Sequence, residues 1–206
     1  LCCLLEVDVP DRDIDWKTRR IIESFEAGLY SFTEMKGKPP EKTDAIESVD
    51  LLVNDKSELK AVTGAIAVGN ALTAGINSSK RLGNLPGNVC TPTYLAEQAK
   101  RLAKDYLSIT TKVIEEKEIE KLGMGAFMSV TQGSVQPGKL IVITHKGGKA
   151  KEAPHVLVGK GITFDTGGIS LKPGGGMHEM IWDMCGAACV FGTMLAIAEQ
   201  GLAMNV

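Results

Sequence analysis

Residues 160–183 carry side chains whose types and spacing could do chemistry. Lys160 and Asp165 stand five residues apart, and Lys172 and Asp183 follow across a Gly-Gly pair and a glycine-rich loop. Carboxylates are hard oxygen ligands for divalent ions, and glycines let the backbone turn sharply or approach a ligand closely. A surface turn with ordinary solvated charges is the structural alternative, but we favour a site because a core needs no such pattern.

The elements around this stretch indicate the fold that must position it. Residues 156–158 form an apolar run before Lys160 and predict a buried strand. Residues 140–143 are also rich in β-branched residues, which is typical of central strands. Residues 94–106 predict a helix that starts after the Thr-Pro-Thr of 91–93. Alternating strands and helices predict an α/β fold with a layered mixed sheet flanked by helices.

The first part of the chain shows the same alternation. Residues 16–32 have apolar side chains at helical spacing and predict an amphipathic helix, and residues 45–53 predict a strand. Ser57 is the expected N-cap of a long alanine-rich helix over residues 59–82. The Asn, Pro and Gly residues of 84–88 should end that helix.

Composition excludes several functions. The chain has 206 residues, a hydrophobic content of 44% and a formal net charge of −2, which gives no electrostatic case for nucleic acid or for an acidic membrane surface. It has no continuous run of about 18 apolar residues, so no membrane span is predicted. Its five cysteines are odd in number and irregularly spaced, which favours a reducing cytoplasm over a disulfide framework.

The motif resembles the leucyl aminopeptidase family, also known as the cytosol aminopeptidase or M17 peptidase family. The resemblance is nearly ungapped and runs through residues 159–173, Met177, Met180, 183–184 and 186–188. Residues 82–96 also resemble the start of the family's catalytic domain. Together the resemblance covers roughly residues 60–206, whereas residues 1–60 match only loosely.

The resemblance implies a domain organisation. Residues 1–56 would be part of a smaller α/β N-terminal domain, 57–82 an interdomain helix, and 83–206 the N-terminal part of an incomplete, zinc-exopeptidase-like catalytic domain. The chain starts without an initiator methionine, and the family's second motif, Asn-Thr-Asp-Ala-Glu-Gly-Arg, does not occur in it. We therefore expect a chain that is truncated at both ends.

The resemblance also assigns roles, residue by residue. Lys160 and Asp183 would ligate one divalent ion, and Asp165 would bridge both ions. Lys172 would be the catalytic cation that stabilises the oxyanion. Met180 would line the pocket for the first side chain of the substrate, where a flexible thioether tolerates varied apolar groups. The expected substrate-binding set is Met180, Lys160, Asp165, Lys172 and Asp183.

The implied function is that of a two-metal aminopeptidase, which removes N-terminal and often leucine-like residues from peptides with Mn²⁺ or Zn²⁺. Bicarbonate would assist the intact enzyme, which is expected to be a cytoplasmic homohexamer without nucleic-acid or membrane partners. This chain carries only the first half of the active-site motif and is expected to be inactive alone. The alternatives are a DNA-binding or regulatory relative, and a structural module without peptidase activity.

Overall fold

A computed structural model describes residues 7–38, 46 and 48–206. The chain divides into two compact units, Leu1–Ala74 and Gly75–Val206, and the division falls within helix α2 (Leu59–Asn84). The predicted helix over residues 59–82 is thereby confirmed. The predicted domain limits at residues 56 and 83 stay predictions.

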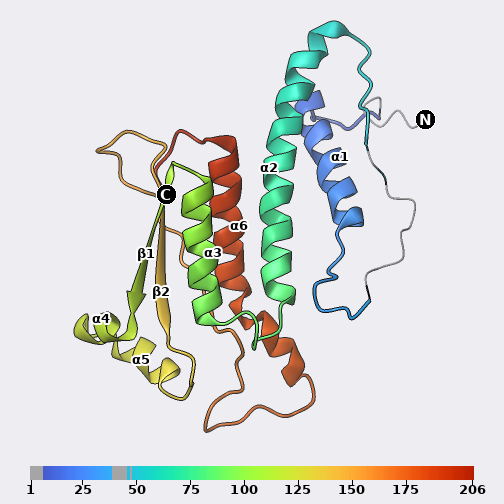
Figure 1. Ribbon diagram of the computed structural model, residues 1–206. Coiled ribbons are helices and arrows are strands. Elements are labelled where there is room, and N and C mark those ends of the chain that lie inside the picture. Colours follow the sequence, from blue (N-terminus) through green and yellow to red (C-terminus); the bar gives the residue numbers. More distant parts are fainter. Residues whose placement is uncertain (1–6, 39–45, 47) are drawn as a thin grey trace. The chain divides into compact units, whose positions relative to one another are not determined.

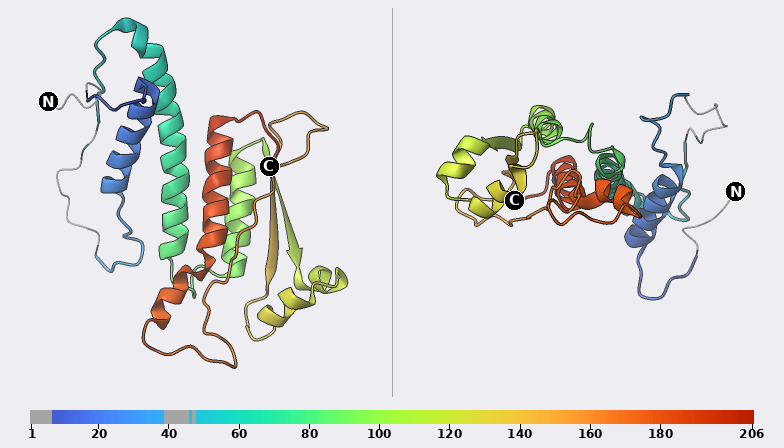
Figure 2. Two further views of the ribbon diagram at one scale, coloured as in Figure 1. Left: turned by 180° about the vertical axis from the view of Figure 1, so that it is seen from behind. Right: turned by 90° about the horizontal axis from the view of Figure 1, so that it is seen from below.

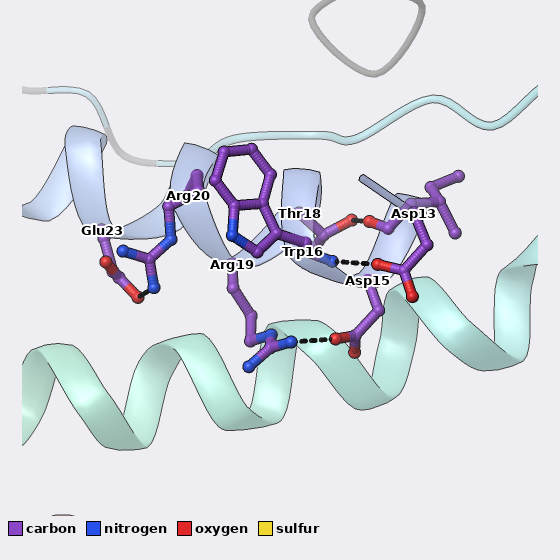
Figure 3. Close-up of polar contacts among 8 residues, drawn as sticks. Asp13, Asp15, Trp16, Thr18, Arg19, Arg20 and Glu23 are labelled. Carbon is purple, nitrogen blue, oxygen red and sulfur yellow. Dashed lines mark hydrogen bonds and ion pairs between the residues drawn. The ribbon is translucent and has the colours of Figure 1, made fainter. Parts of the chain in front are cut away.

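The first unit contains α1 (Ile14–Leu29), which confirms the predicted amphipathic helix. Asp13 caps it by accepting a 2.8 Å hydrogen bond from the backbone N–H of Trp16 (Figure 3). The ion pairs Asp15–Arg19 and Arg20–Glu23 then join successive turns of the same helix. They stabilise the helix locally and form no cluster that could do chemistry.

Two predictions for the segment that leads into α2 are wrong. Residues 48–53 form no strand, and Val49 and Leu52 are exposed, since no neighbouring strand covers them among the described residues. Residues 45 and 47 lie outside the described part of the chain. The N-cap is Asp55, whose carboxylate accepts from the backbone N–H of Ser57, and Ser57 lies within the 3₁₀ turn η2 (Lys56–Glu58).

The second unit is built on a two-stranded antiparallel sheet (Figure 1). Strand β1 (Ile109–Glu115) pairs with β2 (Lys139–His145) in a register that sets Ile109 opposite His145. Helices α4 (Glu116–Lys121) and α5 (Gly125–Thr131) occupy the connection between the strands. Helices α3 (Pro92–Asp105) and α6 (Cys185–Gln200) pack on the sheet. This arrangement confirms the predicted α/β class, with a small antiparallel sheet flanked by helices.

The core of this unit lies between the sheet and α6. Buried side chains from β1, α6 and the end of the chain form one cluster: Ile109, Met194, Ile197, Ala198 and Val206. Thr91 caps α3, and Leu95, Ala96 and Ala99 bury one face of that helix. The core therefore fixes the second half of α6 against the sheet, and the first turn of the same helix contacts the candidate site through the hydrogen bond from Ala187 N–H to Lys160 O.

The predicted buried strand at residues 156–158 is wrong. Residues 147–176 form neither helix nor strand (Figure 2), and Val156 and Val158 are strongly exposed. His155 donates its backbone N–H to Asn205 O, but no ladder of hydrogen bonds joins this stretch to β2. An apolar run becomes a buried strand only where a neighbour pairs with it.

Two helical stretches, Lys56–Asn84 and Met177–Gln200, are long and apolar enough to cross a membrane by length and composition alone. The second contains α6, whose residues Phe191, Met194 and Ile197 are buried in the core. The buried core helix of a folded domain passes the same test of length and composition. The absence of a membrane partner stays a prediction.

Candidate active site

Lys160 and Asp183 form the first of two ion pairs in the glycine-rich region of the second unit. Lys160 Nζ lies 2.8 Å from Asp183 Oδ2, and the Asp183 side chain is only 20% exposed. Apart from Lys160, this buried oxygen has no partner in the part of the chain that the structure describes. A buried carboxylate oxygen with one cationic neighbour retains capacity to accept a further cation.

The backbone that holds this pair depends on two glycines. Asp183 belongs to the 3₁₀ helix η3 (Met177–Met184), which Met184 anchors by complete burial. Lys160 is held against the start of α6, where its carbonyl accepts a 2.8 Å hydrogen bond from Ala187 N–H. A Cβ on Gly159 would lie 2.6 Å from Gly186 O, and a Cβ on Gly186 would lie 2.8 Å from Lys160 N. Only glycine permits this approach.

Lys172 and Asp165 form the second ion pair, with Lys172 Nζ 2.9 Å from Asp165 Oδ2. The other carboxylate oxygen of Asp165 accepts a 2.8 Å hydrogen bond from the N–H of Gly167, which has a φ of 90°. Lys172 Nζ also lies 2.9 Å from Met180 Sδ. The turn thus brings together the predicted catalytic lysine, the predicted bridging carboxylate and the predicted pocket residue.

The two pairs influence each other's ionisation. Hydrogen bonding to Asp183 raises the pKa of Lys160, and Asp165 contributes to this shift. Hydrogen bonding from Lys172 lowers the pKa of Asp165, with further lowering from the Gly167 N–H and from Lys160. All four charges therefore act as one electrostatic cluster. The cluster is open to solvent, because the Lys160 side chain is 59% exposed.

The donor set fits part of a metal site. Asp165 and Asp183 offer oxygens suited to divalent cations, and Lys160 offers an amine when it is unprotonated. Within the described residues, no group of three or more His, Cys, Asp or Glu side chains could hold an ion by itself. Further carboxylates would therefore have to complete the coordination that these residues begin.

Neither His145 nor His178 takes part in the two ion pairs. His145 is buried, and its Nε2 lies 2.9 Å from Leu202 O, so it is a structural residue of the core. His178 is exposed on η3. Sequence reasoning treated neither as a ligand, but it missed the roles of Gly159 and Gly186. The sequence signal for these roles was the glycine itself, present at both positions where the motif approaches the start of α6.

The sequence of the chain matches a known protein family. Residues 77–206 match the model of the cytosol aminopeptidase family, catalytic domain. The chain is 52% identical over 203 residues to a probable cytosol aminopeptidase of Paraburkholderia phymatum. This match covers 98% of the present chain and 40% of that protein. It is 50% identical over 207 residues to a cytosol aminopeptidase of Vibrio cholerae, at 100% and 41% coverage. The chain thus spans less than half the length of these relatives.

The fold also matches solved structures. One is described as the bottromycin maturation enzyme BotP in complex with Mn, with a TM-score of 0.75 and 28% sequence identity. The match covers 98% of this chain and 40% of that one. Because the match extends over nearly the whole chain, the similarity includes the segment that carries both ion pairs.

Proposed function

Because the chain belongs to the cytosol aminopeptidase family, we propose that it supplies part of the active site of a metal-dependent aminopeptidase, which removes N-terminal residues from peptides. The observation that carries the proposal is the convergence of Lys160, Asp165, Lys172 and Asp183 into two ion pairs. The activity is proposed for a polypeptide of the relatives' length, and this chain alone is expected to be inactive.

Lys160, Asp165 and Asp183 are the proposed ligands of two divalent ions, Mn²⁺ or Zn²⁺, with Asp165 shared between them. Such ions polarise a peptide carbonyl and lower the pKa of a bound water. The buried Asp183 Oδ2 supports this assignment, since its ammonium neighbour occupies the place where a cation is favourable. Manganese is the first metal to test, because a structural neighbour of 28% identity is described in complex with Mn.

Lys160 must change its protonation state to act as a ligand. Its amine binds a metal only after losing its proton, whereas Asp183 raises its pKa and so favours the ammonium form. Additional positive charge beside Lys160 would act in the opposite direction and release the proton. Lys160 and Asp183 are therefore an ion pair that divalent cations would replace.

Lys172 and Met180 are the proposed substrate-facing residues. Lys172 places a cation beside Asp165 at the centre of the cluster, where it can stabilise negative charge that develops on the carbonyl oxygen. Met180 Sδ contacts the same ammonium, so the thioether lies next to the reacting region. A flexible apolar side chain there suits leucine-like N-terminal residues. We also propose that bicarbonate assists the reaction, and that the polypeptide of the relatives' length forms a homohexamer in the cytoplasm.

Hydrolysis of leucine p-nitroanilide by a polypeptide of the relatives' length that contains this chain tests the proposed function. Cleavage should depend on Mn²⁺ or Zn²⁺, should stop after dialysis against chelator, and should return when the metal is restored. Rates that persist in protein shown to be metal-free by elemental analysis would contradict the proposal.

A further inference from the structure

Three cysteines in the described part of the second unit differ in their exposure. Cys189 is exposed on α6, Cys185 is half-buried at the first position of the same helix, and Cys90 is buried in the turn that follows α2. Unpaired cysteine is among the most buried residue types, so helix packing accounts for a buried thiol. Packing does not account for the exposed thiol of Cys189.

Cys185 and Cys189 lie on one face of α6. They stand four residues apart in the helix, which places their side chains one above the other. Because helical side chains lean toward the N-terminus, Cys189 leans toward the turn that begins with Cys185. The Cβ atoms of such a pair are about 5–6 Å apart. The two sulfurs can therefore meet after a small local change, without the movement of another element.

A disulfide between these two cysteines would displace the first turn of α6. A disulfide holds its two Cβ atoms about 3.5–4.5 Å apart, which is shorter than the spacing of the pair on a regular helix. Cys185 is the residue that can move, because it begins the helix, whereas Phe191 and Met194 anchor the following turns in the core. The resulting strain makes the bond easier to reduce, as is typical of disulfides that form reversibly.

The same turn holds the proposed metal site. Ala187 N–H donates a 2.8 Å hydrogen bond to Lys160 O, and Lys160 Nζ lies 2.8 Å from Asp183 Oδ2. Asp183 stands two residues before Cys185 in the chain. A displacement of Cys185 toward Cys189 would therefore move the backbone on both sides of this contact, and it would separate Lys160 from Asp183.

We propose that Cys185 and Cys189 form a reversible redox site. Oxidised glutathione, or another small disulfide, joins the two cysteines, and the new bond opens the contact between Lys160 and the first turn of α6. The consequence for metal binding rests on the proposed function, whereas the disulfide and the opened contact do not.

The reaction is a thiol–disulfide exchange in two steps. The exposed Cys189 sulfur attacks one sulfur of oxidised glutathione, whose S–S bond breaks and releases the first glutathione. The Cys185 sulfur then attacks the Cys189 sulfur of this mixed disulfide, and the second glutathione leaves. Each cysteine passes its proton through water to a departing glutathione. The two cysteines lose two electrons, oxidised glutathione gains them, and an excess of reduced glutathione reverses both steps.

Disulfide mapping by mass spectrometry and amide hydrogen exchange test the proposal on a polypeptide of the relatives' length that contains this chain. The metal-free protein is incubated with reduced or with oxidised glutathione, beside Cys189→Ala and the control Cys90→Ala, which removes the buried thiol outside the pair. Oxidised glutathione should link Cys185 to Cys189 in the parent and in Cys90→Ala. Oxidation of the parent should speed exchange at Ala187 by about tenfold or more, and reduction should reverse this. Cys189→Ala should show no such change at Ala187.

Metal titration of the same preparations measures the consequence for the site. In the oxidised parent, the affinity for Mn²⁺ should fall by about tenfold or more, as it does when groups that orient metal ligands are lost. An affinity that oxidation leaves unchanged would overturn the link to the metal site. Mapping and exchange are measured without metal, so they decide the redox site even where the proposed function fails.

Four results of mapping and exchange would overturn the redox site itself. They are the absence of any linkage, a disulfide between Cys90 and Cys185, glutathione that remains on Cys189, and a Cys185–Cys189 disulfide that leaves exchange at Ala187 unchanged.

Discussion

Lys160 Nζ lies 2.8 Å from Asp183 Oδ2, an otherwise unpartnered buried oxygen among the described residues, although the two residues come from opposite ends of the glycine-rich region. The pair is possible because Gly159 and Gly186 let the backbone of Lys160 touch the start of α6. The same arrangement directs an amine and a carboxylate toward one point. This relationship is the structural basis for our proposal that both residues bind one metal ion.

Replacing Lys172 by alanine should lower the rate of peptide hydrolysis without a matching loss of metal. Removing one group that stabilises the oxyanion typically costs about 10²–10³ in kcat. Steady-state kinetics and metal analysis would measure both effects on one preparation of a polypeptide of the relatives' length that contains this chain. Lys112→Ala is a matched control, because Lys112 is exposed and pairs with Glu118 outside the site. A variant that loses metal, and recovers its rate when metal is added, would instead make Lys172 a ligand.

Replacing Gly75 by alanine should destabilise the second unit. A Cβ on Gly75 would collide with the carbonyl oxygen of Gly192 where α2 meets α6. Overpacking of this kind typically costs about 1–3 kcal/mol. Gly64→Ala is the matched control in the same helix, because nothing lies within 4 Å of the added Cβ, and it should stabilise by up to about 1 kcal/mol. Thermal melting of both variants measures these changes in stability. Melting temperatures that shift in the same direction for Gly75→Ala and Gly64→Ala would contradict the packing described.

Because of Cys90, the free energy of unfolding should fall as the pH rises in the alkaline range. Burial raises the pKa of its thiol from 9.0 to about 11. Because the pKa is higher in the folded state, the stabilisation is complete below pH 9 and is lost as the pH rises toward about 11, by on the order of 2 kcal/mol. Denaturant midpoints measured across this range should fall less steeply for Cys90→Ala than for the parent chain. Cys189→Ala, at an exposed position, should leave the slope unchanged.

The sequence predicted the helices, because the residues within a helix themselves show the apolar spacing that indicates it. The helices at residues 14–29, 59–84 and 92–105 follow from apolar spacing and from the Thr-Pro-Thr start of the third, whereas the predicted N-cap Ser57 was wrong, because Asp55 takes that place. The strand at residues 156–158 did not form, because its pairing depends on a neighbour rather than on its own residues. Burial of such a run is a property of the sheet, and the run alone does not determine it.

The site could be predicted in composition but not in connectivity. The motif indicated Lys160, Asp165, Lys172, Asp183 and Met180 as one group. It did not indicate that Lys172 pairs with Asp165 and contacts Met180, or that Lys160 pairs with Asp183. Pairing across a loop depends on the turn at Gly167 and on the approach of residue 159 to α6, and both are backbone conformations that spacing does not specify.

Metal content and leucine p-nitroanilide hydrolysis of Asp165→Asn and of its parent, both as polypeptides of the relatives' length, test whether Asp165 is shared between two divalent ions. An amide keeps the size of the side chain but removes the charge needed to be shared between two cations. The parent should hold two divalent ions per chain and hydrolyse the substrate. The variant should lose at least one ion and at least about 10²-fold in kcat/KM. A variant that keeps two ions and the parental rate would contradict the proposal that Asp165 is a metal ligand of this aminopeptidase site.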